Sequence, residues 1–220
     1  MLPYAGLSPS RPTLRSALWS DSGGRTAAYS VQLRCDHGRV SEPTPYPYRS
    51  PALEATVREV EEFVAAAGWD QQPQLFALVA TPTLLASQPE LAGQLDADAE
   101  LTPVAQEALP AGELDAALAS IEWPEAVAGC ALVQEIVVLP PAAQAGLGEL
   151  PDDPADARRA AAGHPQRREG RLVAAVLRDG VGACVLRLRA ESGDDQGHDE
   201  LVEDPQLAPN LLRALLETLR

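Results

Sequence analysis

The segment WPEAVAGCALVQEIVVLP, Trp123 to Pro140, carries apolar residues on both faces of an extended chain for longer than any other segment. Successive side chains of a strand point to opposite faces. Only Gln134 and Glu135 interrupt the apolar pattern. A strand that is apolar on both faces must be covered on both, so we predict that this is the central strand of a sheet. The two predicted faces are Val127, Ala131, Val133, Val137 and Leu139, and Ala128, Cys130, Leu132, Ile136 and Val138.

A second segment, RLVAAVLRDGVGACVLRLR from Arg171 to Arg189, predicts a β-hairpin. Asp179 and Gly180 between its two apolar runs are the pair preferred in a two-residue type I′ turn. That turn would place Val176 opposite Ala183. One side, facing the core, would then hold Val173, Ala175, Leu177, Cys184, Leu186 and Leu188. The other, partly polar side would hold Arg178, Arg187 and Arg189.

The first helix is predicted from a local signal at its start. Ser50 followed by Pro51 is an N-cap followed by proline at the first helical position. Apolar residues then recur every three or four positions from Leu53 to Ala67. The polar residues between them are predicted to face solvent: Glu54, Arg58, Glu61 and Glu62.

These patterns predict an α+β fold with a sheet of about five strands, antiparallel or mixed, and helices packed mainly on one face. The strands are expected at 75–80, 102–109, 127–139, 171–178 and 182–190. The helices are expected at 51–67, 82–95, 113–122 and 208–219, with the second of these broken near Pro89.

Charge divides the chain into two parts. Residues 1–49 hold six arginines and three acids, net +3, whereas residues 50–220 hold eleven arginines and 29 acids, net −18. We predict a disordered extension over 1–49 and a single α+β domain over 50–220, with a flexible loop at about 140–167. The extension has three open interpretations: a partner-binding arm, a segment that folds against the acidic body, or an overextended translation start.

Composition excludes several classes of function. A net charge of −15 opposes binding to nucleic acid and to anionic membrane surfaces. Aromatic residues make up only 4% of the chain, which disfavours base-stacking sites. The three cysteines, Cys35, Cys130 and Cys184, form no CxxC pair and are expected to be reduced. Without a signal peptide or a membrane-span pattern, a cytoplasmic location is expected.

Candidate site residues are few, because nucleotide-binding, metalloprotease and serine-hydrolase fingerprints are absent. The best ligand-like cluster is His198, Asp199 and Glu200, for which a solvated acidic loop is the competing interpretation. Glu135 interrupts the apolar run. It is a buried carboxylate that serves as an acid or base, the partner of Arg187 or Arg189, or a residue that faces solvent near the end of the strand. The candidate surface residues, also readable as packing lids, are Trp69 and Trp123.

Four segments together resemble an uncharacterised protein family of high-GC Gram-positive bacteria. They are AAAGWDQQPQLFALVAT, IEWPEAVAGCALVQEIVVLP, HPQRREGRLVAAVLRDGVGACVLRLR and DELVEDPQLAPNLLRALLETL. The resemblance covers about residues 50–220 and does not extend over 1–49. It implies no activity, cofactor or catalytic residue.

We expect a noncatalytic cytoplasmic binding domain, without a cofactor, that acts through a partner protein or as a homodimer. The hairpin edge or the C-terminal leucine helix would form the dimer. The alternative is a small hydrolase or transferase with a carboxylate or metal site near Glu135 and His198. A pocket that joins Glu135, an arginine and a histidine would favour this enzyme.

Overall fold

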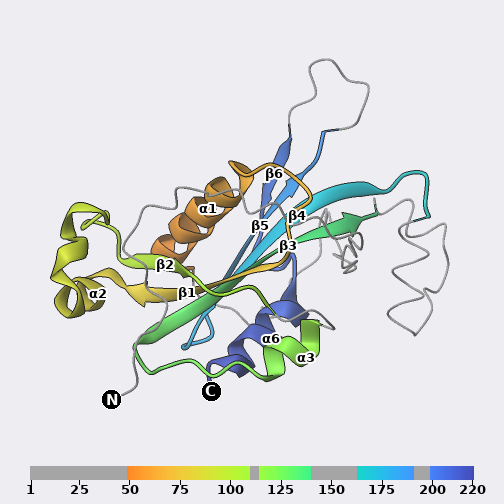
Figure 1. Ribbon diagram of the computed structural model, residues 1–220. Helices are drawn as coiled ribbons and strands as arrows, with labels where there is room; N and C mark the ends of the chain where they lie inside the picture. The colour runs from red at the N-terminus through yellow and green to blue at the C-terminus, as the bar shows by residue number, and fades with distance from the viewer. Residues whose placement is uncertain (1–48, 110–113, 140–162, 191–198) are drawn as a thin grey trace.

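The computed structural model describes residues 49–109, 114–139, 163–190 and 199–220. These residues form an open, fully antiparallel sheet of six strands in the order β2-β1-β3-β4-β5-β6 (Figure 1). The strands are β1 Gln74–Ala80, β2 Leu101–Ala105, β3 Val127–Val138, β4 Arg168–Leu177, β5 Gly182–Leu188 and β6 Glu200–Glu203. The predicted α+β class and antiparallel sheet are therefore confirmed.

The sheet has six strands where about five were predicted. The additional strand, β6, pairs with β5 through Leu201 opposite Arg187 and Val202 opposite Leu186. The sequence around β6 is rich in acidic residues, and we predicted a loop there for that reason. Four residues are too few for a periodic signal, so only pairing with β5 defines this strand.

The helices are α1 Pro51–Ala65, α2 Thr81–Ser87, α3 Leu114–Ala119 and α6 Pro209–Thr218, with a short 3-10 helix, η1, at Pro89–Gly93. The expected break near Pro89 is confirmed, since α2 ends before it and η1 begins at it. The predicted cap is also present: the Ser50 side chain accepts a hydrogen bond from the backbone N–H of Leu53.

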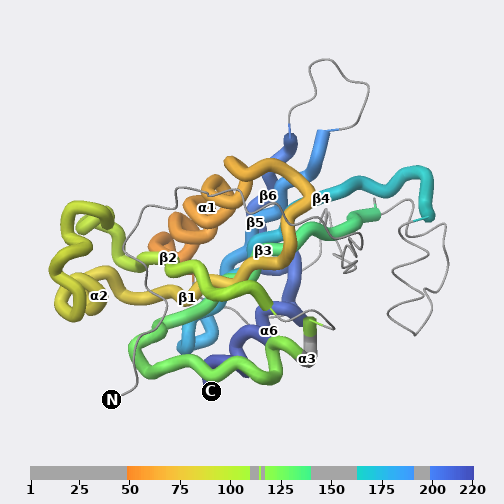
Figure 2. Tube along the Cα trace, viewed as in Figure 1, coloured from red at the N-terminus to blue at the C-terminus, as the bar shows by residue number. Residues whose placement is uncertain are grey.

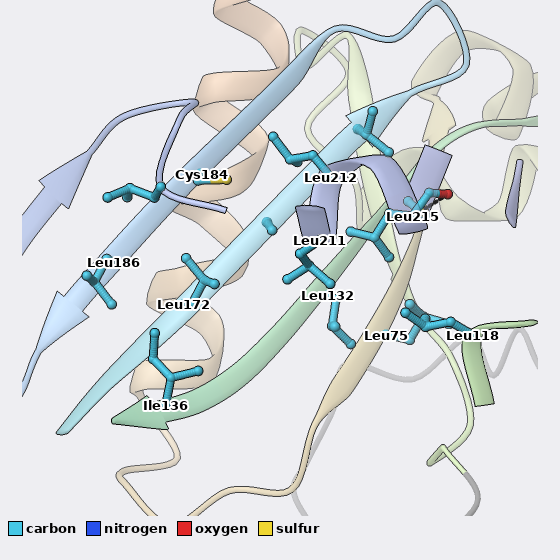
Figure 3. Packing of buried hydrophobic residues seen from close by; sticks show 14 of the residues in the cluster. Leu75, Leu118, Leu132, Ile136, Leu172, Cys184, Leu186, Leu211, Leu212 and Leu215 are labelled. Carbon is cyan, nitrogen blue, oxygen red and sulfur yellow. Dashed lines mark hydrogen bonds between the residues drawn. The ribbon is translucent and has the colours of Figure 1, made fainter. Parts of the chain in front are cut away.

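Helices cover both faces of the sheet, which differs from the expected packing mainly on one. Figure 1 shows α1 across one face and α3 and α6 together on the other, and Figure 2 shows the same arrangement along the chain trace. Leu211, Leu212 and Leu215 of α6 lie over the strands in Figure 3. The reason is the central strand itself, because its two apolar faces each require a cover.

The segment from Trp123 does form an interior strand. β3 pairs with β1 on one side and β4 on the other. Cys130, Leu132 and Ile136 are fully buried on the α6 face, and Ala131 is fully buried on the α1 face. Both faces of β3 therefore belong to a core, as the sequence predicts.

The hairpin between β4 and β5 forms at the predicted place with a different register. Val173 lies opposite Val185, and Val176 lies opposite Gly182, not Ala183. Leu177 and Val181 close a three-residue loop, in which the N–H of Leu177 donates to the carbonyl of Val181 at 2.9 Å. Gly180 alone in this loop has a positive φ, +88°, whereas a type I′ turn requires two such residues.

This shift of one residue changes which side chains share a face. Val173 and Ala175 face α1 together with Ala183 and Val185. Cys184, Leu186 and Leu188 instead face α6, together with the even-numbered apolar residues of β4. The predicted core-facing side therefore combined residues from both faces.

The predicted extension at 1–49 and most of the predicted loop at 140–167 lie outside the described residues. The part of the loop that is described, 163–167, forms turns that lead into β4. Among the described helices, none has the length and apolar character needed to cross a membrane.

Candidate functional site

Three charged residues form a row across the sheet on the face that α1 covers. Glu135 of β3 lies opposite Arg171 of β4, and Arg171 lies opposite Arg187 of β5. Directly opposite residues of antiparallel strands project to the same face, so the three side chains are neighbours. The row ends at Leu201 of β6, which lies opposite Arg187.

Glu61 of α1 lies over this row and balances its positive charge. Arg187 donates to Glu61 from Nε to Oε1 at 2.6 Å and from Nη2 to Oε2 at 2.5 Å. The Nη1 atom of Arg171 lies 4.0 Å from Oε1 of the same carboxylate. The side chains of Arg171 and Glu61 are only 1% and 2% exposed, so the charge of each must be balanced by neighbouring charges of the opposite sign rather than by water. The hydrogen bonds to Glu61 also raise the pKa of Arg187.

The loop between α1 and β1 is attached to the same network through Glu135. The carboxylate accepts hydrogen bonds from the backbone N–H groups of Asp70 at 3.0 Å and Gln71 at 3.1 Å. It also accepts one from Nη2 of Arg171 at 3.2 Å. Arg171 donates in addition to the backbone carbonyl of Gly68. The left-handed backbone at Asp70, φ 67°, is thus held by charge-assisted bonds.

Trp69, in the same loop, forms cation–π contacts with two arginines. The guanidinium carbon of Arg171 lies 4.7 Å from a Trp69 ring centroid, and that of Arg189 lies 5.3 Å away. Arg189 also pairs with Glu169 at 2.7 Å. Trp69 therefore lies against Arg171, the middle residue of the charged row, and against Arg189 outside it, which agrees with its interpretation as a packing lid.

The structure brings most of the predicted site residues together, but not all of them. Glu135, Arg187 and Arg189 belong to the network, and Asp199 lies at its rim, 4.0 Å from Nη1 of Arg187. Glu200 lies on the opposite face of the sheet, which α6 covers, and pairs with Arg168 at 3.0 Å. His198 lies outside the described residues.

Trp123, the second candidate surface residue, contacts α6 and the hydrophobic cluster on the α6 face rather than the charged network. Its indole N–H donates to Oγ1 of Thr218 at 2.9 Å, which fixes it beside the end of α6. The side chain also packs against the hydrophobic cluster on the α6 face. This position agrees with packing rather than with an exposed ligand-binding surface.

Two central residues were missed from the sequence, and one partner was misassigned. Glu135 meets Arg171, not Arg187 or Arg189. Glu61, predicted to face solvent, is buried. A signal for Glu61 exists, because it follows Val57 by four positions and so borders the apolar stripe of α1. Arg171 gave no such signal, since it stands at the start of an apolar run.

The chemistry of the network is that of a structural clamp. Both carboxylates already accept hydrogen bonds from arginines, and Glu135 accepts two more from the backbone. The described residues bring no histidine to Glu135: His164 instead accepts a hydrogen bond at Nδ1 from the N–H of Gln166. In the same part of the chain, no three His, Cys, Asp or Glu side chains gather to hold a metal ion.

The two described cysteines are free and buried. Burial raises the pKa of Cys130 to about 11 and that of Cys184 to about 12. Both thiols are therefore protonated at neutral pH, which makes them poor nucleophiles. This agrees with their expected role as reduced core residues.

Comparisons with known proteins give a family and no activity. Neither the curated proteins nor the solved structures contain a match to this chain. A family model described as PPA1309-like protein matches residues 53–220, which is more than half of the chain. That family is uncharacterised, takes its name from a Propionibacterium and has no assigned function. Apart from the first two residues of α1, the match covers every described helix and strand, so the chain belongs to the PPA1309-like protein family.

Proposed function

We propose that this protein is a noncatalytic cytoplasmic interaction domain that binds an extended segment of another protein, or of a second copy, at the free edge of β6. The observation that carries the proposal is this edge. Among the described strands, β6 has a neighbour on one side only. Alternate residues of such a strand direct their N–H and C=O groups away from the sheet. A second strand satisfies these groups by main-chain hydrogen bonds.

The side chains of β6 support the same role. Leu201 is 44% exposed and is one of two large hydrophobic residues exposed in the described part of the chain. It lies directly beside the charged row, opposite Arg187. An added strand would cover this leucine and remove apolar surface from water.

The opposite edge of the sheet is less suited to strand addition. β2 contains Pro103 at its centre, opposite Leu78 of β1. Proline has no N–H to donate, and its presence is a common way of protecting an edge strand from further pairing. The two edges of the described sheet therefore differ, and β6 is the edge strand without a proline.

The clamp of Glu61, Arg171 and Arg187 supports a binding role over a catalytic one. The clamp connects α1 to β4 and β5, next to the proposed edge. It also engages Glu61 in ion pairs, so this carboxylate is not available as a catalytic acid or base. A fixed strand β5 holds β6 in a constant orientation, which reduces the entropy that is lost on binding. The acidic charge makes nucleic acid and anionic membranes unsuitable partners.

Position-specific photocrosslinking in living cells tests the proposal. Benzoylphenylalanine in place of Leu201 is expected to give one adduct of discrete mass, with a partner or with a second copy. The matched control carries the same group in place of Phe63, which is 42% exposed but lies on α1. Adducts of equal yield from both positions, or no adduct from position 201, would contradict binding at β6.

A further inference from the structure

The proposed binding at β6 is the basis of a sharper inference about the partner. We propose that the strand added at β6 comes from a different protein and carries the pattern cationic–apolar–apolar–cationic. The edge sequence that it would meet is DELVED, residues 199–204. Its two central residues are apolar and are flanked by acids on both sides.

The pairing with β5 fixes which face each side chain of β6 occupies. Leu201 and Glu203 lie opposite Arg187 and Val185, so they face α1. Glu200 and Val202 lie opposite Leu188 and Leu186 and face α6. An added strand would therefore meet one apolar residue and one carboxylate on each face of the sheet.

A second copy of this chain is a poor occupant of the edge. In an antiparallel pair, directly opposed side chains project to the same face of the sheet. When a two-fold axis relates two β6 strands, this condition is met only if the axis passes beside one residue, which then lies opposite the same residue of the second copy. In all four such registers two carboxylates meet, and directly opposed like charges destabilise strand pairing. The opposed acids are Glu203 with Asp199, Glu200 with Asp204, Glu200 with Glu200, or Glu203 with Glu203.

A cationic strand meets the same carboxylates favourably. The side chains of Glu200 and Glu203 are 57% and 38% exposed, so both remain accessible from outside. Arg168 donates to one oxygen of Glu200, and Arg58 donates to both oxygens of Glu203. Each carboxylate oxygen has a second lone pair, which can accept from a cation of the added strand. The acidic charge of residues 50–220, eleven arginines against 29 acids, would also attract a cationic segment over longer distances.

The spacing of the acids defines the partner pattern. Glu200 and Glu203 are separated by Leu201 and Val202, and Val202 packs partly against the core on the α6 face. A strand with two cations three positions apart places each opposite one carboxylate. Its two intervening apolar residues then cover Leu201 and Val202. Each favourable cross-strand pair contributes roughly 0.2–1 kcal/mol.

Three capped hexapeptides test the charge pattern on the full chain: TRVVRT, its charge-reversed form TEVVET, and TRPPRT. The last has the charge of the first but lacks two backbone N–H groups. We expect TRVVRT to slow amide hydrogen exchange in residues 200–203 and to bind about tenfold more tightly than TEVVET, because two attractive pairs replace two repulsive ones. We expect TRPPRT to give no protection at β6.

The variant Glu200→Gln with Glu203→Gln supplies the matched control, because it keeps side-chain size and removes both charges. Its preference for TRVVRT over TEVVET should fall to about twofold or less. Equal protection of β6 by TRVVRT and TEVVET would overturn the charge pattern while leaving strand addition at β6 intact. Protection by neither peptide, together with self-association lost on Leu201→Glu, would overturn the inference in favour of a second copy.

Discussion

Arg187 and Glu61 are joined by two hydrogen bonds of 2.6 and 2.5 Å although 126 positions separate them in the sequence. The pair ties the first helix to the fifth strand. The Glu61 carboxylate also lies 4.0 Å from Nη1 of the buried Arg171, so its loss would remove negative charge from beside two arginines at once.

We therefore expect Glu61→Gln to lower the free energy of unfolding by about 3–5 kcal/mol, the usual effect of removing one partner of a buried ion pair. Urea denaturation followed by circular dichroism measures this. Glu62→Gln changes the adjacent, exposed carboxylate and should stay within about 0.5 kcal/mol of the original protein. Similar losses in the two variants would show that Glu61 has no special role.

Gln134 presents a different case, because it is 1% exposed and neither its amide oxygen nor its amide nitrogen has a hydrogen-bond partner among the described residues. A buried polar group without a partner costs about 1–3 kcal/mol. Gln134→Met keeps a similar shape and removes the polar atoms, so we expect the melting temperature to rise by roughly 2–8 °C. Differential scanning calorimetry measures it, with Gln72→Met on the exposed loop as the control. A lower melting temperature for Gln134→Met would mean that the amide is satisfied in solution.

Glu59 of α1 should destabilise the fold at neutral pH. Burial first, and then the charges of Asp96 and Glu62, raise the pKa of Glu59 above the ordinary value of a glutamate. A carboxyl with a raised pKa in the folded state favours folding less once it ionises, so its contribution to stability falls as pH rises through the unfolded-state and then the folded-state pKa. Glu59→Gln should therefore melt at a higher temperature than the original protein at pH 7, and this gain should shrink towards zero near pH 3.5.

Thermal unfolding across that pH range measures the effect. Glu90→Gln, on η1, removes a carboxylate from a different element and corrects for the general change in net charge. A gain for Glu59→Gln that is independent of pH would show that its charge is not the cause.

Arg58 connects α1 to the proposed binding edge. Its Nε and Nη2 atoms donate to Glu203 at 2.6 and 2.5 Å, and these hydrogen bonds are the main cause of the lowered pKa of Glu203. Arg58→Met should return the pKa of Glu203 towards its ordinary value and speed amide exchange in residues 200–203. Carboxyl titration and hydrogen exchange followed by NMR measure both. Because the pair is exposed, the effects should weaken at high salt.

Several features of this protein follow from local sequence. The alternation from Val127 to Leu139 specifies a strand with two apolar faces, because side chains of an extended chain alternate whatever lies around them. Ser50 and Pro51 specify where α1 begins, since a cap acts on backbone groups three residues away. The family resemblance over about residues 50–220 agrees with the matched residues 53–220.

Which residues face each other across the strands was decided only by the tertiary structure. Asp179 and Gly180 located the hairpin loop, yet the three-residue length of that loop set the register of β4 and β5. The resulting shift of one residue moved half of the hairpin's side chains to the other face. The hairpin offers Glu135 three arginines, Arg171, Arg187 and Arg189, and only the alignment of β3 with β4 placed Arg171 opposite it. Local patterns fix the conformation of a segment because they act over a few residues. Pairing across more than one hundred positions depends on how whole elements pack, which no short stretch of sequence contains.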